Sequence, residues 1–305
     1  MRIGLWIEDA ARRLNEIAVD AKAAQEHGIS RLWFSQRDGW DSLSLITALA
    51  PQTPQIRYGV GVVPIYPRHP LALAAQALSV QAATDNRLTL GIGSSHPVII
   101  EGQYGLSMEQ PAKYMREYVE ALAPLLAGQP VDRAGDRLTA RGQLAIDGAL
   151  APELLIAALG PRMLQIAGEL TDGTITSWAG PEVIADYIRP TLDKASAGKE
   201  IVACVCVAVT NQPEAAHQWI QDHYGMAGTL PAYRAILDRG AAAGPADTAV
   251  LGDEAEVERQ LQRFADAGAT EFMFAPVGTA EEIARTVEFA YSLGSTVTQS
   301  DAAGR

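Results

Sequence analysis

Short apolar segments alternate with amphipathic segments along most of the chain. Eight of the apolar segments are typical of strands, at residues 2–7, 31–35, 56–62, 88–92, 154–159, 174–177, 201–209 and 271–275. The continuous apolar, β-branched character of the segment at 201–209 fits a strand that is buried on both faces, as in a parallel sheet. Because most of the eight are followed by a segment with helical periodicity, the repeat predicts a (β/α)8 TIM barrel, an α/β fold. In such a barrel the ligand site lies at the C-terminal ends of the strands.

Capping residues and helix breakers set the predicted helix boundaries. We expect helices at about 12–27, 42–50, 71–84 and 111–126, and two more that begin at 160–161 and 180–181. Asp253 with Glu256 and Thr279 with Glu282 form capping boxes at the start of the last two helices. Those helices are predicted to end at Gly268 and Gly294, since glycine commonly follows a helix. The small and polar residues 295–305 are predicted to be a frayed tail.

Two stretches interrupt the alternation of strands and helices. Residues 129–151, after the fourth strand and its helix, contain small strand-like pieces and are predicted to be an inserted hairpin or excursion. Residues 212–250, after the seventh strand, exceed a simple connection, and their helical composition suggests a second insertion that acts as a lid. The chain shows no domain linker, so we expect one domain over residues 1–305.

Composition and charge narrow the possible functions. The formal net charge of −12 disfavours binding to a phosphate backbone, so we expect no nucleic-acid partner. The longest apolar run, residues 201–209, is about half of what a membrane-spanning helix needs. The chain begins directly with a strand and shows no secretory signal, which predicts a cytoplasmic protein. The two cysteines, Cys204 and Cys206, are expected to face the same side of one strand as small buried hydrophobes.

Glycines and a histidine follow the third and fourth strands. Residues 87–96 run from a strand into a loop with Gly91, Gly93 and then His96, which is well placed for chemistry at a barrel mouth. The loop lacks the third glycine and the helix of a dinucleotide-binding fingerprint. Residues 59–64 end the third strand with glycines that either allow a flat ligand to approach the backbone or only serve packing. His69 precedes a helix, where it caps or stacks.

The loops after the fifth and sixth strands offer a candidate phosphate site. Free amides at a helix N-terminus, at residues 160–162, together with the hydroxyls of Thr176 and Ser177, would form a phosphate cradle, although helix capping alone explains the same residues. The five histidines show no metal-binding spacing, so we expect no metal. The absence of a Gly-x-Ser-x-Gly elbow leaves nucleophilic hydrolysis unsupported.

Taken together, residues 24–35, 56–70, 87–93 and 155–173 resemble the luciferase-like monooxygenase superfamily, and more narrowly its branch that uses the deazaflavin coenzyme F420. The resemblance covers roughly residues 3–290 and is weakest over 129–151 and 212–250. It implies an oxidoreductase that holds a tricyclic deazaflavin at the strand ends and acts on a small organic substrate. It also implies a cis peptide at Gly61–Val62, beneath the ring, and a homodimer.

The resemblance further implies which residues bind the coenzyme. The ring would lie against residues at the ends of the second, third and fourth strands, and the phosphate would bind near the amides and hydroxyls that follow the fifth and sixth. The coenzyme-binding residues expected on this basis are Ser35, Gly61, Val62, Val63, Pro64, Ser95, His96, Leu159, Gly160, Thr176 and Ser177.

Two positions of the resemblance bear on the chemistry. Alcohol-oxidising members have a histidine base where this chain has Arg37, and arginine stays protonated in proteins and cannot act as a base. The acidic residue that other members have after the fourth strand aligns with His96, which can deliver a proton near neutral pH. We therefore expect a reductase in which His96 protonates or orients the substrate and Arg37 stabilises developing negative charge.

Other assignments remain open at the level of sequence. Trp40, Trp178 and Tyr66 are candidates to line the pocket, although aromatic packing is the favoured interpretation for any one of them. An FMN-dependent monooxygenase would bind its phosphate at the same place as coenzyme F420. A barrel that binds a flavin-like ligand without catalysis is a further alternative, because the histidine base is replaced by Arg37. The substrate is not specified, since its walls would come from the loops where the resemblance is weakest.

Overall fold

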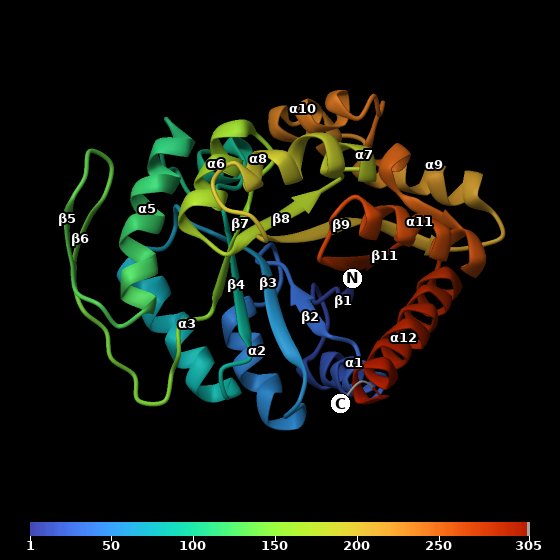
Figure 1. The fold of residues 1–305 in the computed structure, drawn as a ribbon, viewed down its shortest axis with the longest axis horizontal. Coiled ribbons are helices and arrows are strands. Elements are labelled where there is room, and N and C mark those ends of the chain that lie inside the picture. Colours follow the sequence, from blue (N-terminus) through green and yellow to red (C-terminus); the bar gives the residue numbers. More distant parts are fainter. Residues whose placement is uncertain (304–305) are drawn as a thin grey trace.

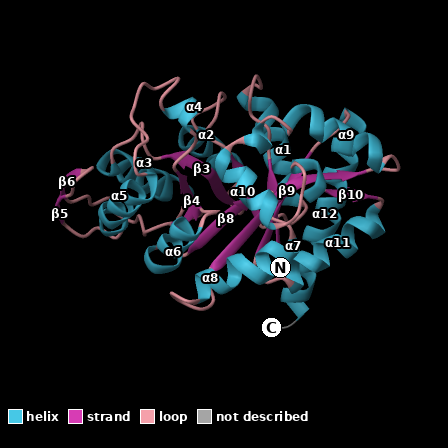
Figure 2. Cartoon of the chain, turned by 90° about the horizontal axis from the view of Figure 1, so that it is seen from above, coloured by secondary structure: helices cyan, strands magenta, loops and turns pink. Residues whose placement is uncertain are grey.

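Eight parallel strands close into a barrel surrounded by helices (Figures 1 and 2). The computed structural model describes residues 1–303, with side chains described as far as residue 295. The strands pair in chain order, and β8 pairs with β9 to complete the barrel. This confirms the predicted fold, and each predicted strand lies within two residues of an observed one. The eight strands are β1 (Arg2–Trp6), β2 (Arg31–Phe34), β3 (Arg57–Pro64), β4 (Leu88–Gly93), β7 (Glu153–Ala157), β8 (Gly173–Ser177), β9 (Glu200–Val209) and β11 (Glu271–Pro276).

The helices pack their apolar faces against the outside of the barrel, where most of the buried hydrophobic residues gather in one cluster. Asp41 caps α2 by accepting a hydrogen bond from the Ser44 amide, and His69 caps α3 in the same way through the amide of Leu71. The longer helices on the barrel wall are α1 (Leu14–Glu26), α2 (Ser42–Leu49), α3 (Pro70–Thr84), α5 (Pro111–Leu126), α6 (Pro161–Leu170), α11 (Glu254–Asp266) and α12 (Ala280–Ala303).

The two segments that interrupt the alternation of strands and helices, residues 129–151 and 212–250, each form secondary structure in addition to the barrel. In the first, β5 (Val131–Ala134) and β6 (Thr139–Gly142) pair antiparallel as the predicted hairpin, which lies beyond α5 at the left edge of Figure 1. In the second, α9 (Pro213–Tyr224) and α10 (Pro231–Arg239) lead into the short strand β10 (Val250–Gly252), which pairs with β9 outside the barrel. The predicted lid is helical, but β10 was not expected. In Figures 1 and 2, α10 lies above the centre of the strands.

The structure differs from the predicted elements in three parts of the chain. The last helix continues through Gly294 to Ala303, because this glycine lets α12 approach the backbone of residues 27–28: an added Cβ would lie 2.9 Å from the His27 carbonyl oxygen. The predicted tail is therefore helical as far as residue 303, and residues 304–305 lie outside the described part. The loop after β4 contains the short helix α4 (Pro97–Ile100). The helix expected from residue 181 divides into α7 (Pro181–Val183), a π-helical turn (Ile184–Ile188) and α8 (Arg189–Asp193).

The barrel interior is filled mainly by one indole. Trp33 is completely buried and packs with Leu155, Ile175, Val202 and Met273, while Gly59 leaves room for it. A Cβ at Gly59 would lie 2.4 Å from the indole, so only glycine fits this strand position. The centre of the barrel is therefore a packed core, and ligands are restricted to its ends.

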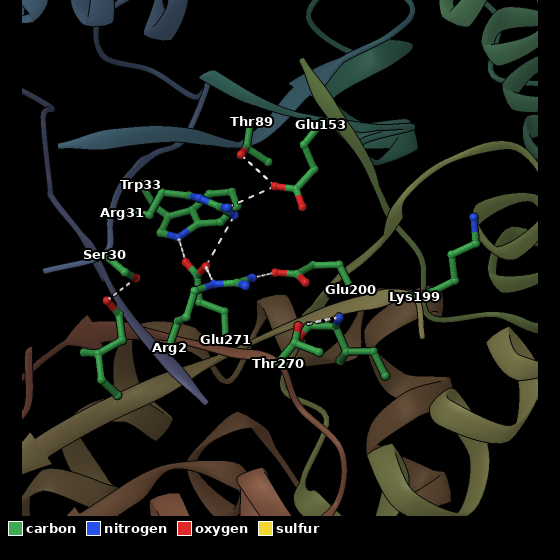
Figure 3. Close-up of polar contacts among 12 residues, drawn as sticks. Arg2, Ser30, Arg31, Trp33, Thr89, Glu153, Lys199, Glu200, Thr270 and Glu271 are labelled. Atoms are coloured by element: carbon green, nitrogen blue, oxygen red, sulfur yellow. Dashed lines mark hydrogen bonds and ion pairs between the residues drawn. The ribbon is translucent and has the colours of Figure 1, made fainter. Parts of the chain in front are cut away.

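A network of charged side chains lies at the N-terminal end of the barrel (Figure 3). Arg31 is 3% exposed and its guanidinium lies 2.9 Å from a Glu153 carboxylate oxygen and 3.3 Å from one of Glu271. The Trp33 indole N–H donates to the other Glu271 oxygen at 2.6 Å, and the Thr89 hydroxyl donates to Glu153 at 2.8 Å. These contacts close the floor of the barrel with paired charges.

Candidate functional site

A cavity of about 340 Å³ opens at the C-terminal ends of the barrel strands. Its volume is within the range of pockets that bind cofactors and small molecules. Apolar side chains from the barrel interior form its inner part, and loops with polar and aromatic side chains form its rim. The residues that line it are Trp6, Ser35, Gln36, Arg37, Asp38, Gly61, Val62, Pro64, Ser95, His96, Ile99, Gln103, Tyr104, Ile175, Ser177, Trp178, Cys204, Val205, Cys206, Tyr224, Tyr233, Met273, Ala275 and Val277.

Most of the residues that the sequence placed in the site line this cavity. They come from the ends of four strands and the loops that follow them, as the barrel geometry requires. The resemblance placed a cis peptide at Gly61–Val62, and this bond is cis in the structure. The predicted residues that line the cavity are Ser35, Arg37, Gly61, Val62, Pro64, Ser95, His96 and Ser177.

Four predicted residues do not line the cavity. Val63 points the other way along β3 and is completely buried in the outer core. Thr176 is also completely buried, and its hydroxyl donates to the backbone carbonyl of Val202 at 3.4 Å, so only Ser177 of this pair reaches the cavity. Leu159 and Gly160 lie outside the lining. All four were expected from the resemblance, and a sequence does not show which residues of a strand or loop face a cavity.

The loop between β7 and α6 remains accessible beside the cavity. Gly160 is the N-cap of α6, and an added Cβ there would meet no atom within 4 Å. The Leu159 carbonyl accepts a hydrogen bond from the Tyr187 hydroxyl at 3.2 Å. Tyr187 lies on the π-helical turn, and the guanidinium of Arg239 is 3.8 Å from its ring centroid. The predicted phosphate cradle therefore has an open helix N-terminus with a cation nearby, and its binding role stays a prediction.

Hydrogen bonds fix the wall of the cavity formed by the first three strands. The Trp6 indole N–H donates to the Ser35 hydroxyl at 3.0 Å, and this hydroxyl donates to the Gly61 carbonyl at 2.9 Å. Ser35 thus connects the side chain of β1 with the backbone of β3. Because both hydrogen bonds use the serine hydroxyl, the carbonyl of the cis peptide is held in a defined direction beneath the cavity.

His96 lies at the rim, at the junction between β4 and α4. Burial lowers the pKa of His96 below its usual value, so the imidazole is largely neutral at pH 7. Its ring lies 4.9 Å from the ring of Tyr233, measured between centroids. Ser95, immediately before it, has a φ of 60°, a conformation that is uncommon for a residue with a side chain and that turns the chain toward the cavity.

Arg37, in the loop after β2, provides positive charge at the rim. Its guanidinium lies 3.0 Å from the Glu8 carboxylate and 5.2 Å from the centre of a Trp6 ring. About half of each charged side chain is exposed, so this ion pair adds little to stability. Because only one guanidinium nitrogen donates to Glu8, other N–H groups of Arg37 are available to an anion in the cavity.

Aromatic residues from the second insertion cover the cavity, and sequence analysis did not identify them. Tyr224 comes from the end of α9 and Tyr233 from α10. The Tyr233 ring lies 4.5 Å from the Trp178 ring, between centroids, and its hydroxyl is close enough to the Ser177 side chain for Ser177 to act on the pKa of Tyr233. The only sequence signal was the length of the 212–250 insertion, which does not single out a residue.

Of the three aromatic residues considered from sequence, the structure places one in the cavity. Trp178 lines it, with a φ of 55° that turns its indole over the strand ends. Trp40 is more exposed and donates its indole N–H to the Arg12 carbonyl at 3.0 Å. Tyr66 stacks on Tyr114 at 4.6 Å, away from the lining.

The two cysteines line the innermost part of the cavity. Cys204 and Cys206 are two residues apart on β9 and face inward together, as predicted. Burial raises the pKa of each thiol to about 12, so both are protonated at neutral pH. They therefore act as small apolar wall residues and not as nucleophiles.

The described residues were also considered for metal binding and membrane insertion. No group of three His, Cys, Asp or Glu side chains is arranged to hold a metal ion within the part of the chain that the structure describes. Over the same residues, no helix has the length and apolar character needed to span a bilayer.

Comparison with known proteins places this site in context. A sequence model of the protein family described as luciferase-like monooxygenase matches residues 1–296 of this chain. A 5,10-methylenetetrahydromethanopterin reductase from Methanolobus tindarius is 31% identical over 169 residues, which cover 55% of this chain and 51% of the relative. A reductase of the same name from Archaeoglobus fulgidus is 31% identical over 198 residues, covering 63% and 59%. The matched segments thus span less than two thirds of these relatives.

Structural similarity extends over nearly the whole chain. The coenzyme F420-dependent tetrahydromethanopterin reductase from Methanopyrus kandleri superposes with a TM-score of 0.75, covering 95% of this chain and 97% of that protein. The sequence identity in this superposition is 19%, so the similarity concerns the fold.

Proposed function

The chain belongs to the luciferase-like monooxygenase family, and on that premise we propose that it is a coenzyme F420-dependent oxidoreductase that reduces a small organic substrate. The observation that carries this proposal is the cavity at the strand ends, where His96 and Arg37 face the same space above an apolar wall. The choice of coenzyme is supported by similarity in sequence to a putative coenzyme F420-dependent oxidoreductase from Mycobacterium tuberculosis, which is 26% identical over 243 residues, and by similarity in fold to the F420-dependent reductase from Methanopyrus kandleri.

The cavity fits a planar ring of this kind. Val62, Ile175 and Met273 provide an apolar surface against which a flat ring can pack, and hydroxyl groups lie at its edge. When bound in its reduced form, coenzyme F420 supplies a hydride. Gly61, Val62 and Ser35 would hold the ring, and Ser177 with the amides at Leu159 and Gly160 would hold the phosphate.

The side chains at the rim would complete the reduction of a polarised double bond. His96 would deliver a proton to the substrate atom that does not receive the hydride, and Arg37 would stabilise negative charge on the substrate through its free N–H groups. Because burial lowers the pKa of His96, the protonated form is scarce at pH 7. We therefore expect turnover to rise as the pH falls toward the pKa of His96.

Coenzyme titration and a variant of His96 test this function together. We expect the purified protein to bind coenzyme F420, observed by fluorescence, and to bind FMN more weakly. His96→Gln should lower turnover with reduced coenzyme F420 by about 10²- to 10⁴-fold, since it removes the proton donor, and should change coenzyme affinity far less than turnover. His223→Gln is the matched control, because His223 lies outside the cavity and stacks on Trp219; it should leave both unchanged.

Three results would contradict this assignment. Tighter binding of FMN together with oxygen-dependent turnover would indicate a monooxygenase. Binding of coenzyme F420 without hydride exchange over a broad substrate panel would indicate a non-catalytic binding protein. Full turnover by His96→Gln would remove His96 from the mechanism.

The resemblance also predicts a homodimer, which light scattering of the purified protein measures.

A further inference from the structure

The aromatic ring of Tyr233 packs on the imidazole of His96 at the rim of the cavity. The two ring centroids are 4.9 Å apart, and the planes are inclined by 53°. Within the described part of the chain, the imidazole forms no side-chain hydrogen bond. Its orientation therefore depends on packing, in contrast to histidines that are fixed by a carboxylate or carbonyl partner.

Two further side chains surround Tyr233. Its ring packs against Trp178 at 4.5 Å between centroids and 58° between planes. Its hydroxyl is close enough to the side chain of Ser177, at the end of β8, for Ser177 to act on the pKa of Tyr233. The Trp178 indole in turn lies within hydrogen-bonding reach of the Cys206 thiol. Tyr233 is thus a fixed surface on the insertion, placed between His96 and the end of β8.

We propose that Tyr233 is a positioning residue for His96, so that the insertion at residues 212–250 completes the reaction site. The ring of Tyr233 holds the imidazole over the cavity, in the orientation needed to deliver a proton to the bound substrate. This role rests on the proposed function, in which His96 is the proton donor. It also assigns a function to α10, which the barrel itself does not require.

The surroundings of His96 allow this role to be measured. Its lowered pKa arises from burial, with no charged group as a cause, and Tyr233 is part of what buries it. The other titratable or charged groups that line the cavity are Arg37 and Asp38 after β2, Tyr104 after α4, Cys204 and Cys206 on β9, and Tyr224 on α9. Removing the Tyr233 ring should admit water and move the pKa of His96 up toward its usual value.

Two substitutions of Tyr233 separate ring packing from hydrogen bonding. Tyr233→Ala removes the ring, whereas Tyr233→Phe retains it and loses only the hydroxyl. We expect Tyr233→Ala to lower kcat by roughly a hundredfold, as misplacement of a catalytic group does, with a smaller change in KM. Tyr233→Phe should recover most of this loss. Met226→Ala, at an 82% exposed position on the same insertion, is the control and should leave kcat unchanged.

Histidine NMR titration of the free protein provides a readout that does not depend on turnover. The His96 signal is assigned by its absence in His96→Gln. The pKa of His96 should rise in Tyr233→Ala and stay low in Tyr233→Phe and Met226→Ala, and the alkaline limb of the kcat profile, where activity falls as His96 loses its proton, should move in the same direction. If Tyr233→Ala does not fold, Tyr233→Leu is measured instead, because it keeps the apolar volume while losing the aromatic ring; its kcat should fall as in Tyr233→Ala.

The outcomes distinguish this inference from the proposed function. An unchanged His96 pKa and an unchanged pH profile in Tyr233→Ala, while His96→Gln is inactive, would overturn the positioning role alone. Unchanged kcat in Tyr233→Leu would do the same. A raised His96 pKa in Tyr233→Ala, while His96→Gln retains full turnover, would instead overturn the proposed function and leave the packing of Tyr233 on His96 supported.

Discussion

The two ends of the barrel use the same strands for opposite purposes. At the N-terminal end, Arg31, Glu153 and Glu271 form a buried network of paired charges. At the C-terminal end, the inward positions carry hydroxyl, thiol and small apolar side chains, and the charged Arg37 is on the exposed rim. A buried charge is strongly destabilising without its partner, so replacing one charged residue at the N-terminal end should lower the stability of the fold. The C-terminal end, where the charged side chains are exposed, can accept different residues around a ligand.

The strand β2 and the residue that follows it show the contrast between the two ends of the barrel within five residues. Arg31, Trp33 and Ser35 all face the barrel axis, because side chains alternate along a strand. Arg31 belongs to the charged floor, Trp33 to the packed centre and Ser35 to the cavity wall. Each step of two residues thus changes the environment from ion pairs to hydrophobic packing to ligand contact. Stability and function are therefore separated along the axis of one barrel.

The largest expected effect comes from breaking the floor. Arg31→Met removes the cation that pairs with Glu153 and leaves the buried Glu271 carboxylate with only the half-exposed Arg2 as a charged partner, so unfolding should become easier by about 3–5 kcal/mol. Urea denaturation measures this change. Glu8→Gln at the mouth, which breaks the exposed pair with Arg37, is the control and should change stability by less than about 1 kcal/mol. Equal losses of stability in Arg31→Met and Glu8→Gln would contradict the proposed difference between the two ends of the barrel.

The thiols of the cavity provide the next test. Because burial raises the pKa of Cys204 and Cys206 from 9.0 to about 12, iodoacetamide at pH 8 should modify them roughly a thousandfold more slowly than a free thiol. The raised pKa means that the reactive thiolate becomes common only in strongly alkaline solution, so the rate should climb with pH throughout. Mass spectrometry follows the modification. Rapid labelling at pH 8 would show that the mouth is more open to water than the structure indicates, and labelling in urea serves as the reference.

A smaller effect is expected from the glycine that accommodates Trp33. Gly59→Ala places a Cβ 2.4 Å from the indole and should destabilise the fold by about 1–3 kcal/mol, as overpacking does. Thermal unfolding measures the loss. Gly160→Ser at the mouth meets no neighbouring atom and supplies a good N-cap, so its stability should stay within about 0.5 kcal/mol of the original. A tolerated Gly59→Ala would mean that Trp33 is not tightly fixed.

Sequence patterns predicted the elements better than their contacts. All eight barrel strands and the hairpin at β5 and β6 were predicted, since hydrophobic periodicity and turn residues act locally. Gly294 was misread as a helix end, because its role is to admit a backbone from a distant part of the chain. The strand β10 was missed for a related reason, since its three residues form a strand only through pairing with β9.

For the candidate site, too, sequence patterns predicted the residues near strand ends better than the contacts between distant segments. Ser35, Gly61 and His96 were predicted near the site because they lie at or after the ends of predicted strands, and they line the cavity because a barrel brings all strand ends to one face. Thr176 was misplaced because the sequence does not show which of two adjacent hydroxyls faces inward. Tyr233 could not be found at all, since it lies 137 positions after His96 and meets it only across the folded insertion.

By itself, then, the sequence determined the barrel, the order of its elements and the loops that surround the site. These depend on periodicity and on local backbone preferences, which act over a few residues. The tertiary structure alone decided that Arg31, Glu153 and Glu271 pair beneath the barrel, and that Tyr233 packs on His96 above it. Both arrangements join residues from distant segments, and the free energy of burying charge or ring surface is set only when those segments meet.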